Sequence, residues 1–332
     1  MRPEGKGKKP MYDVTALGEI LIDFTPCGEC DGVPAFAQNP GGAPLNVLVQ
    51  NAHLGGKTAF IGKVGADGFG NSLRQLMVGN HIETRGLMVS QDIHTTLAFV
   101  QLDEKRERSF SFYRNLGADI MLTQQEIDAD LIRQSHIFHF GSLSVTAEPA
   151  RSATLAAINI AKDAGCILSY DPNYRAPLWH SEKEAVDAML ALMPDVDLLK
   201  VSDEEMELLV GTRDLNEGSK RLAAYDIALV CISCGGKGSY FRRGNDCRYV
   251  PGYNVTIEDT NGAGDSFFGA VHYQLRNKTL TDINAMTMEE LTQLFRFANA
   301  AGALTIQKKG AIPAMARLDT IRAFIREQDW QI

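Results

Sequence analysis

Apolar and polar positions follow two alternating rhythms along most of the chain. Short runs rich in Val, Ile, Leu and Phe, such as 57–65 and 197–202, are typical of buried β-strands. Between such runs lie stretches with apolar residues every three or four positions, such as 43–56 and 150–165, which predict amphipathic helices. Strands that alternate with helices predict an α/β fold, with a mostly parallel central sheet and helices on both faces.

The same pattern sets the approximate bounds of the remaining elements. We expect strands at 12–23, 57–65, 136–142, 166–173, 197–202, 227–233 and 253–257. We expect helices at 43–56, 68–80, 150–165, 184–194, 203–211, from about 262 onwards, and around 298–304.

Two segments break the alternation. Residues 24–40 are rich in Pro and Gly, and residues 95–114 carry two apolar runs around the polar turn DEKRER, as in a β-hairpin. We expect a small antiparallel β lid built from segments near 24–40 and 93–116. A lid beside an α/β sheet excludes water from a reaction, although a hairpin with no such role is the alternative.

Composition sets the broad class of the protein. The chain has 332 residues, of which 45% are apolar and 22% charged, with a formal net charge of -8. We expect one domain over 12–332 and a flexible basic tail at 1–11, because no linker divides the chain. The acidic balance disfavours nucleic acid as a partner. No apolar run reaches the length of about 18 residues that a membrane helix needs, so we expect a cytoplasmic protein without a membrane partner.

Two pairs of cysteines have the C-x-x-C spacing of zinc sites. Cys231 and Cys234 lie in the apolar run IALVCISC, which predicts a buried strand. Residues three apart on a strand point to opposite faces, which disfavours a shared metal and favours free buried thiols. The same spacing argues against a metal between His136 and His139.

Polar residues gather where the predicted strands end. In open α/β sheets ligands bind at the carboxyl ends of the strands, so clusters from separate strands should converge on one cleft. The clusters are Asp23 after the first strand; Asp171, Asn173 and Arg175; Ser202 and Glu205; and residues 259–265.

The stretch EDTNGAGDSFFGA at 258–270 carries the clearest chemical pattern. Its glycines allow backbone N–H groups to surround an anion, and the helix that follows adds its positive dipole end. Asp265 in the first helical turn can reach the same point, so an anion site with a base beside it suits phosphoryl transfer. An acidic helix cap is the alternative on spacing alone. The motifs G-x-x-x-x-G-K-[ST] and G-x-G-x-x-G are absent, which disfavours an NAD-dependent oxidoreductase.

Together with GGAPLNVLVQNAHLGG at 41–56, the stretch DTNGAGDSFFG at 259–269 resembles the two signatures of ribokinase-like (phosphofructokinase B type) carbohydrate kinases. The resemblance extends from about Tyr12 to the C-terminus. Within the family the chain is most similar to fructokinases, as in GEILIDF, NPGGAPLNV and SYDPNYRAPLW. It implies a ribokinase-like fold.

The resemblance also implies roles for single residues. Asp265 matches the catalytic base, and the anion hole matches Gly262, Ala263 and Gly264. The sugar-binding positions of the family match Asp23, Gly41, Gly42 and Asn46. Asn173 belongs to a cluster expected beside the substrate. Arg114 and Arg175 are candidate cations for the phosphates, with a surface salt bridge as the alternative for each.

The nucleotide side is implied in the same way. Ser202 and Glu205 match the N-x-x-E motif, which organises Mg²⁺ through water, with Ser in place of the usual Asn. Asp259, with backbone near Gly310 and Ala314, resembles a monovalent-cation site for K⁺. The nucleotide loop and an adenine-side position match Ser233, Gly235, Gly238 and Asn299.

The expected activity is phosphorylation of fructose at its primary hydroxyl, with ATP and Mg²⁺ and with K⁺ as a further cation. The alternatives are 2-keto-3-deoxygluconate, whose carboxylate Arg114 could bind, another hexose, or a nucleoside. A non-catalytic sugar sensor is the alternative from another class, disfavoured by the intact Asp265. By resemblance alone, a homodimer through the lid is expected.

Overall fold

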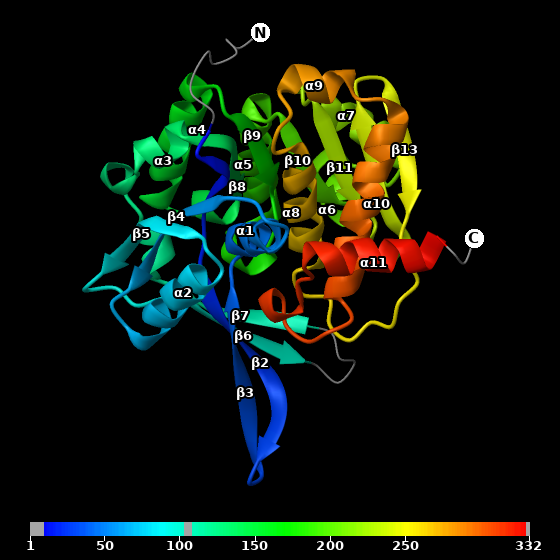
Figure 1. Ribbon diagram of the computed structural model, residues 1–332. Helices are drawn as coiled ribbons and strands as arrows, with labels where there is room; N and C mark the ends of the chain where they lie inside the picture. Colours follow the sequence, from blue (N-terminus) through cyan, green and yellow to red (C-terminus); the bar gives the residue numbers. More distant parts are fainter. Residues whose placement is uncertain (1–9, 103–107, 330–332) are drawn as a thin grey trace.

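The computed structural model describes residues 10–102 and 108–329 (Figure 1). Within this part, nine strands form the central sheet, parallel except at one edge, where β12 and β13 run antiparallel. The spatial order is β13 (Asp246–Pro251), β12 (Gly238–Arg243), β11 (Leu229–Ser233), β10 (Leu198–Ser202), β9 (Ile167–Asp171), β8 (Ser135–Gly141), β1 (Tyr12–Leu17), β4 (Thr58–Gly65) and β5 (Glu83–Ser90).

Helices cover both faces of this sheet, each over its own apolar core, and the predicted fold class is confirmed. One face carries α1 (Ala43–His53), α2 (Gly68–Gly79), α8 (Ala263–Leu275), α9 (Leu280–Ala285), α10 (Met288–Thr305) and α11 (Leu318–Asp329). The other carries α3 (Ala129–Arg133), α4 (Ala150–Ala164), α5 (Glu182–Leu192), α6 (Asp203–Val210) and α7 (Leu215–Ala223).

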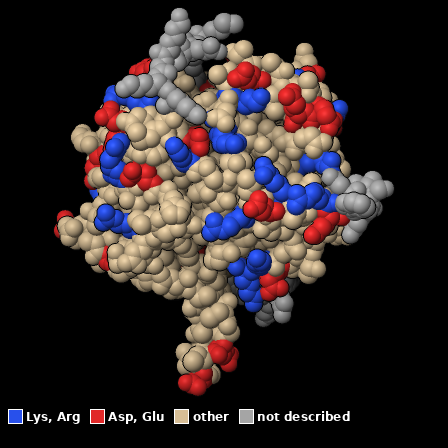
Figure 2. Space-filling view, in the orientation of Figure 1, with Lys and Arg blue, Asp and Glu red and all other residues tan. Residues whose placement is uncertain are grey.

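The predicted lid is a second sheet of four strands among the described residues. It consists of two antiparallel hairpins, and their inner strands β2 and β6 pair in parallel. Figure 2 shows the β2–β3 hairpin projecting from the body, with acidic residues near its tip, where Glu29 and Asp31 are exposed. The polar turn at 103–107 lies outside the described residues. The strands are β2 (Leu21–Cys30), β3 (Val33–Gly41), β6 (Leu97–Leu102) and β7 (Arg108–Tyr113).

Two predicted strands are wrong in detail. The first, at 12–23, is two strands, because the chain leaves the central sheet at Gly18 and enters the lid. A Cβ at Gly18 would lie 2.6 Å from Cγ of Pro44, so the chain passes close to α1 at this break. Asp23 therefore lies within lid strand β2 and does not end the first strand.

The second error is the strand expected at 253–257, which is irregular in the structure. The backbone N–H groups of Glu258 and Asp259, just after it, both donate to the carbonyl of Ile306 at the end of α10. The chain is therefore held by a helix end and not by a neighbouring strand. The edge strands β12 and β13, which the pattern did not predict, complete the sheet instead.

Strand order places the ligand edge of the sheet. β1 lies between β8 and β4, so the chain order reverses there, and the lid continues directly from β1 (Figure 1). Ligands in open α/β sheets bind at the carboxyl ends of strands beside such a reversal. Residues 1–9, most of the predicted tail, lie outside the described residues. None of the described helices is both long and apolar enough to cross a bilayer.

Candidate active site

A cleft of about 880 Å³ lies between the lid and the first turns of α1 and α8. Its wall is built from segments far apart in sequence, and it includes residues from three of the four strand-end clusters, while Ser202 and Glu205 lie outside it. Among the residues predicted for the site, those that line the cleft are Asp23, Gly42, Asn46, Asn173, Arg175, Asp259, Gly262 and Asp265.

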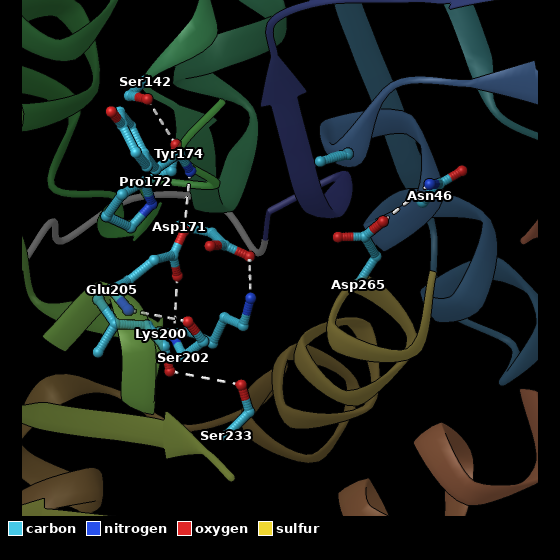
Figure 3. A network of polar contacts seen from close by, with 12 residues as sticks. Asn46, Ser142, Asp171, Pro172, Tyr174, Lys200, Ser202, Glu205, Ser233 and Asp265 are labelled. Atoms are coloured by element: carbon cyan, nitrogen blue, oxygen red, sulfur yellow. Dashed lines mark hydrogen bonds and ion pairs between the residues drawn. The ribbon is translucent and has the colours of Figure 1, made fainter. Parts of the chain in front are cut away.

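The centre of the site is a contact between α1 and α8. Asn46 Nδ2 donates to Asp265 Oδ2 at 2.8 Å, and so the two sequence motifs meet side chain to side chain (Figure 3). The helices approach closely because position 269 is glycine. A Cβ at Gly269 would lie 2.5 Å from the carbonyl oxygen of Val47. Close packing of two helices therefore fixes the direction of the Asp265 carboxylate.

The glycines before Asp265 form the start of α8. Gly262 is the N-cap residue with φ of 73°, a left-handed conformation that favours glycine, and a Cβ there would lie 2.6 Å from Cβ of Ala311. No side chain of the described residues caps the helix, and Asp265 lies inside the first turn. The first N–H groups of a helix have no intrahelical partner. They are thus available for an anion, which favours the anion hole over the acidic cap.

Burial and nearby charged groups shift the pKa of the Asp265 carboxyl in opposite directions. Burial raises its pKa above the ordinary value, while the Lys200 ammonium, the hydrogen bond from Asn46 and the Arg175 guanidinium act in the opposite direction. A carboxyl with a raised pKa is a better proton acceptor than an ordinary Asp. The group therefore suits the role of a general base.

The sugar-side residues converge from the lid and from the loop after β9. Burial raises the pKa of Asp23 to about 6, although the Arg175 guanidinium acts against this shift. Asp23 packs against Gly41, where a Cβ would collide with the carboxylate. Asn173 has φ of 51°, a left-handed conformation that is uncommon outside glycine and that holds it at the cleft wall. These groups offer a carboxylate, an amide and a cation to one ligand.

Glu19 is a cleft residue that sequence reasoning missed. It is 3% exposed, and its Oε1 accepts the backbone N–H of Ala43 at 2.9 Å at the start of α1. Burial raises its pKa to about 7, while that hydrogen bond and the Arg114 guanidinium lower it. The signal was a glutamate inside the otherwise apolar run GEILID.

Lys200 and Asp171 form a second feature that the site predictions did not include. Lys200 on β10 is 6% exposed and Asp171 at the end of β9 is 1% exposed, and Nζ donates to Oδ2 at 2.9 Å (Figure 3). Asp171 was noted only as part of a strand-end cluster. A lysine in the apolar strand DLLKVS was the available signal for its partner.

Ser202 and Glu205 form a capping box at the start of α6. The N–H of Glu205 donates to Ser202 Oγ at 3.0 Å, and the N–H of Ser202 donates to Glu205 Oε2 at 2.8 Å. The other oxygen, Oε1, accepts the N–H of Tyr174 at 2.8 Å. Glu205 thus ties α6 to the loop after β9 (Figure 3). The two residues lie outside the residues that line the cleft.

The predicted nucleotide residues form a separate group. Ser233 on β11 is beside Ser202 in the sheet register. Gly235 and Gly238 have φ of 55° and 124°, and Gly238 packs against the backbone of β13. Asn299 Nδ2 donates to the carbonyl oxygens of Val250 at 3.1 Å and of Pro251 at 3.2 Å, and so joins α10 to this edge. These residues also lie outside the cleft lining.

Arg114 lies apart from the cleft lining. Its Nε donates to Asp119 Oδ2 at 2.7 Å, and its terminal nitrogens donate to Thr146 Oγ1 at 3.1 Å and to the Leu143 carbonyl oxygen at 2.9 Å. The side chain is buried, so it forms a buried ion pair and not the surface salt bridge weighed from the sequence. Its guanidinium is held by Asp119, Thr146 and Leu143, whereas that of Arg175 lines the cleft and donates to the Tyr174 carbonyl oxygen at 2.9 Å.

Asp259 joins the two loops beside the cleft. Its Oδ1 accepts the N–H of Asn261 at 3.0 Å, and its Oδ2 accepts the N–H of Gly310 at 2.9 Å. The carboxylate therefore orders the backbone before α8 and the loop after α10, where the family resemblance implies a monovalent-cation site.

Comparison with known proteins agrees with this geometry. The sequence pattern of the pfkB family carbohydrate kinases matches residues 11–317. The chain is 41% identical to fructokinase-2 of Solanum lycopersicum over 91% of this chain and 92% of that protein. A crystal structure of fructokinase with bound ATP from Xylella fastidiosa has a TM-score of 0.89 at 31% identity, covering 96% and 100% of the two chains. A fructokinase double mutant from Vibrio cholerae O395, in fructose, ADP and potassium ion bound form, has a TM-score of 0.84 at 31% identity, covering 96% and 99%.

Proposed function

This chain belongs to the pfkB family of carbohydrate kinases, and on that premise we propose that it transfers the γ-phosphoryl group of ATP to the primary hydroxyl O6 of fructose. The products are fructose 6-phosphate and ADP. The observation that carries the proposal is Asp265, which is held by Asn46 in the cleft beside the uncapped start of α8. The similarity to fructokinases of known structure supports fructose as the acceptor.

In the proposed reaction Asp265 accepts the proton of the sugar hydroxyl. The hydroxyl oxygen forms a bond to the γ-phosphorus while the bond from phosphorus to the departing ADP oxygen breaks. An alcohol is a poor nucleophile at neutral pH, so removal of its proton in the transition state accelerates the attack. The N–H groups of Gly262, Ala263 and Gly264 stabilise the charge on the moving phosphoryl group.

The sugar is bound from the opposite side of the cleft. Asp23 accepts hydrogen bonds from sugar hydroxyls, and Asn46 and the backbone of Gly41 and Gly42 position the ring. Arg175 and Asn173 complete the wall after β9. The lid lies over this part of the cleft and excludes water, which would otherwise compete with the sugar for the phosphoryl group.

ATP would carry Mg²⁺, which neutralises phosphate charge when bound. Glu205 is the residue proposed to hold this Mg²⁺ through water, since each of its oxygens accepts a single N–H and keeps a lone pair. The nucleotide would lie toward the group formed by Ser202, Ser233, Gly235, Gly238 and Asn299. Asp259 is the proposed organiser of a K⁺ site made from loop carbonyls.

The experiment that tests the activity is a panel of acceptors assayed with ATP and Mg²⁺. The panel holds fructose, glucose, ribose, adenosine and 2-keto-3-deoxygluconate, with ADP formation as the readout. Fructose should give the highest kcat/KM, because Arg114, the cation named for an acidic sugar, is paired with Asp119. No turnover of fructose would contradict the proposal. Binding of fructose without turnover would point to a sensor.

We also propose a homodimer through the lid. Apolar side chains of the lid sheet are exposed, with Val33 63%, Phe36 43% and Tyr113 67% accessible. Exposed apolar side chains gathered on one small sheet are typical of an interaction surface. Sedimentation velocity should give a dimer for the wild type and a monomer for Phe36→Asp, while a monomeric wild type would contradict it.

A further inference from the structure

A buried cation lies directly beneath the start of α8. Lys200 Nζ is 3.0 Å from the position that a Cβ on Gly264 would occupy, so the ammonium packs against the residue before Asp265. Asp171 fixes it there through the contact of 2.9 Å. Replacement of the glycine by a larger residue would displace the ammonium. The anion hole and this ion pair therefore share one wall.

Carboxylates from three elements surround this ammonium. Asp171 on β9, Glu205 on α6 and Asp265 on α8 each raise the pKa of Lys200, and together they outweigh the lowering that burial alone would cause. Lys200 is therefore charged. It in turn is the strongest of the charges that lower the pKa of Asp265.

Several other titratable groups, from different elements, lie near Lys200 or act on Asp265. Glu205 is held by two N–H groups, and Asp171 Oδ1 is buried with no partner among the described residues. His139 from β8 and Cys231 from β11 also face Lys200, and both stay neutral because burial lowers the histidine pKa and raises the thiol pKa. The charged groups that act on Asp265 are Asp23, Asp171, Arg175, Lys200 and Glu205.

We propose that Lys200 is a positioning residue for the phosphoryl transfer: its ammonium, fixed by Asp171 against Gly264, keeps Asp265 in the ionised form that accepts the sugar proton. The inference rests on the proposed function, in which Asp265 is the base. Without Lys200 the pKa of the Asp265 carboxyl should rise further, because burial and the neighbouring carboxylates both favour its neutral form.

A buried ion pair with a purely structural role makes a different prediction. Removing one partner of such a pair destabilises the fold, and the rate then falls equally at every pH. A positioning role toward Asp265 instead moves the acidic side of the pH profile. The shape of the profile therefore separates the two explanations.

The experiment measures kcat from pH 5 to pH 9 with both ATP and fructose saturating, so that the pH dependence of fructose binding through Asp23 does not enter the profile. The acidic limb is the part of the pH profile where the rate falls as pH decreases. In Lys200→Met this limb should lie at a pH higher by about one unit or more than in the wild type, and most of the wild-type rate should return at pH values above it. Lys200→Arg keeps the charge and should keep the limb near that of the wild type.

Lys63→Met is the matched control. Lys63 is a largely buried lysine paired with Glu126 at 2.7 Å, and it does not line the cleft. The acidic limb of the pH profile of Lys63→Met should coincide with that of the wild type. Circular dichroism checks that each variant is folded, and if Lys200→Met does not fold, Lys200→Gln takes its place with the same expected shift.

A uniform loss of rate with an unmoved limb in Lys200→Met would overturn the inference. If the wild type phosphorylates fructose and the acidic limb does not move in the Lys200 variants, only the proposed role of Lys200 is contradicted. If the wild type turns over no fructose at any pH, the proposed function falls, and the role of Lys200 falls with it.

Discussion

At the residue scale, Asp23 shows how burial sets the pH range of binding. Because burial raises its pKa to about 6, the carboxylate is ionised above that pH and protonated below it. Fructose affinity measured by calorimetry should therefore weaken as pH falls through about 6. Asp23→Asn should bind roughly tenfold to a hundredfold more weakly, the equivalent of about 1.5–3 kcal/mol for a hydrogen bond to a charged group, with no dependence on pH in this range.

The matched control for Asp23 is Asp31→Asn at the exposed tip of the same hairpin. It should bind fructose as the wild type does at every pH. Wild-type affinity in Asp23→Asn would remove Asp23 from the sugar site.

Gly262 offers a test of the anion hole itself. Gly262→Ala adds a Cβ to a left-handed residue and places it 2.6 Å from Cβ of Ala311, so α8 should lose stability by more than about 1–2 kcal/mol and its N–H groups should shift. We expect kcat to fall at least tenfold while the fold persists. Urea unfolding and steady-state kinetics measure both effects.

Gly211 is a close control, since it has the same φ of 73° and open space around its Cβ position. Gly211→Ala should carry the backbone cost alone and keep wild-type kcat. Equal kinetics in the two alanine variants would contradict the role given to the start of α8.

Single residues also mark how far sequence reasoning reached. The glycines and Asp265 were predicted because their spacing is local and their backbone geometry is specific. Glu19 and Lys200 were missed because their surroundings come from distant segments: Glu19 meets the start of α1, and Lys200 meets Asp171 and Gly264. Their only local sign was a charge within a mostly apolar run.

At the scale of elements, the packing of α1 against α8 holds the site together. Gly269→Ala would place a Cβ 2.5 Å from the Val47 carbonyl, which should separate the helices and lengthen the contact between Asn46 and Asp265. We expect a loss of about 1–3 kcal/mol in the free energy of unfolding and a lower kcat. Thermal unfolding and kinetics measure the two.

The control for this helix pair is Gly79→Ala in α2, where a Cβ meets nothing within 4 Å. It should leave the protein unchanged or slightly more stable, because Ala favours helix more than Gly does. If Gly269→Ala behaves in the same way, the close helix contact does not position the base.

Elements show a second limit of sequence patterns. The run 12–23 is mostly apolar, so periodicity alone could not reveal that the chain changes sheets at Gly18. Residues 253–257 alternate as a strand does, yet the neighbouring backbone bonds to Ile306 at the end of α10. In both places the outcome depends on which distant element offers a hydrogen-bonding partner.

At the scale of the whole molecule, two buried histidines link stability to pH. His139 on β8 and His272 on α8 are both hydrogen-bonded to Ser169 Oγ, at 3.2 and 2.6 Å. Burial lowers the pKa of His139 to about 3, so the unfolded chain binds this proton more readily between about pH 6.5 and 3. Stability should therefore fall with falling pH by up to about 1.4 kcal/mol per pH unit for each such group.

His139→Gln should flatten this dependence, so its stability relative to the wild type should improve as pH falls from 6.5 toward 4. Denaturant unfolding at several pH values measures the difference. The exposed His180→Gln should run parallel to the wild type. A constant difference between His139→Gln and the wild type across the range would contradict the explanation.

The whole fold was predictable to a large degree because the alternation of strands and helices extends over most of the chain. The rule that ligands bind at strand ends predicted that Asp23 and Asp265 converge, and the family resemblance added Asn46 to the same site. All three residues line one cleft in the structure, although Asp23 lies within lid strand β2 and not at a strand end of the central sheet. The position of the Arg114 side chain was not predictable. Its partner Asp119 is only five residues away, but it lies in a loop whose conformation the sequence pattern does not specify.

The most direct test of the account compares fructose phosphorylation by the wild type and by Asp265→Asn, with ATP and Mg²⁺ saturating. The wild type should form fructose 6-phosphate and ADP in equal amounts. Asp265→Asn should lose at least a hundredfold in kcat, because the proton acceptor is gone, while it binds fructose within a few-fold of the wild type. A kcat for Asp265→Asn close to that of the wild type would contradict the assignment of Asp265 as the base.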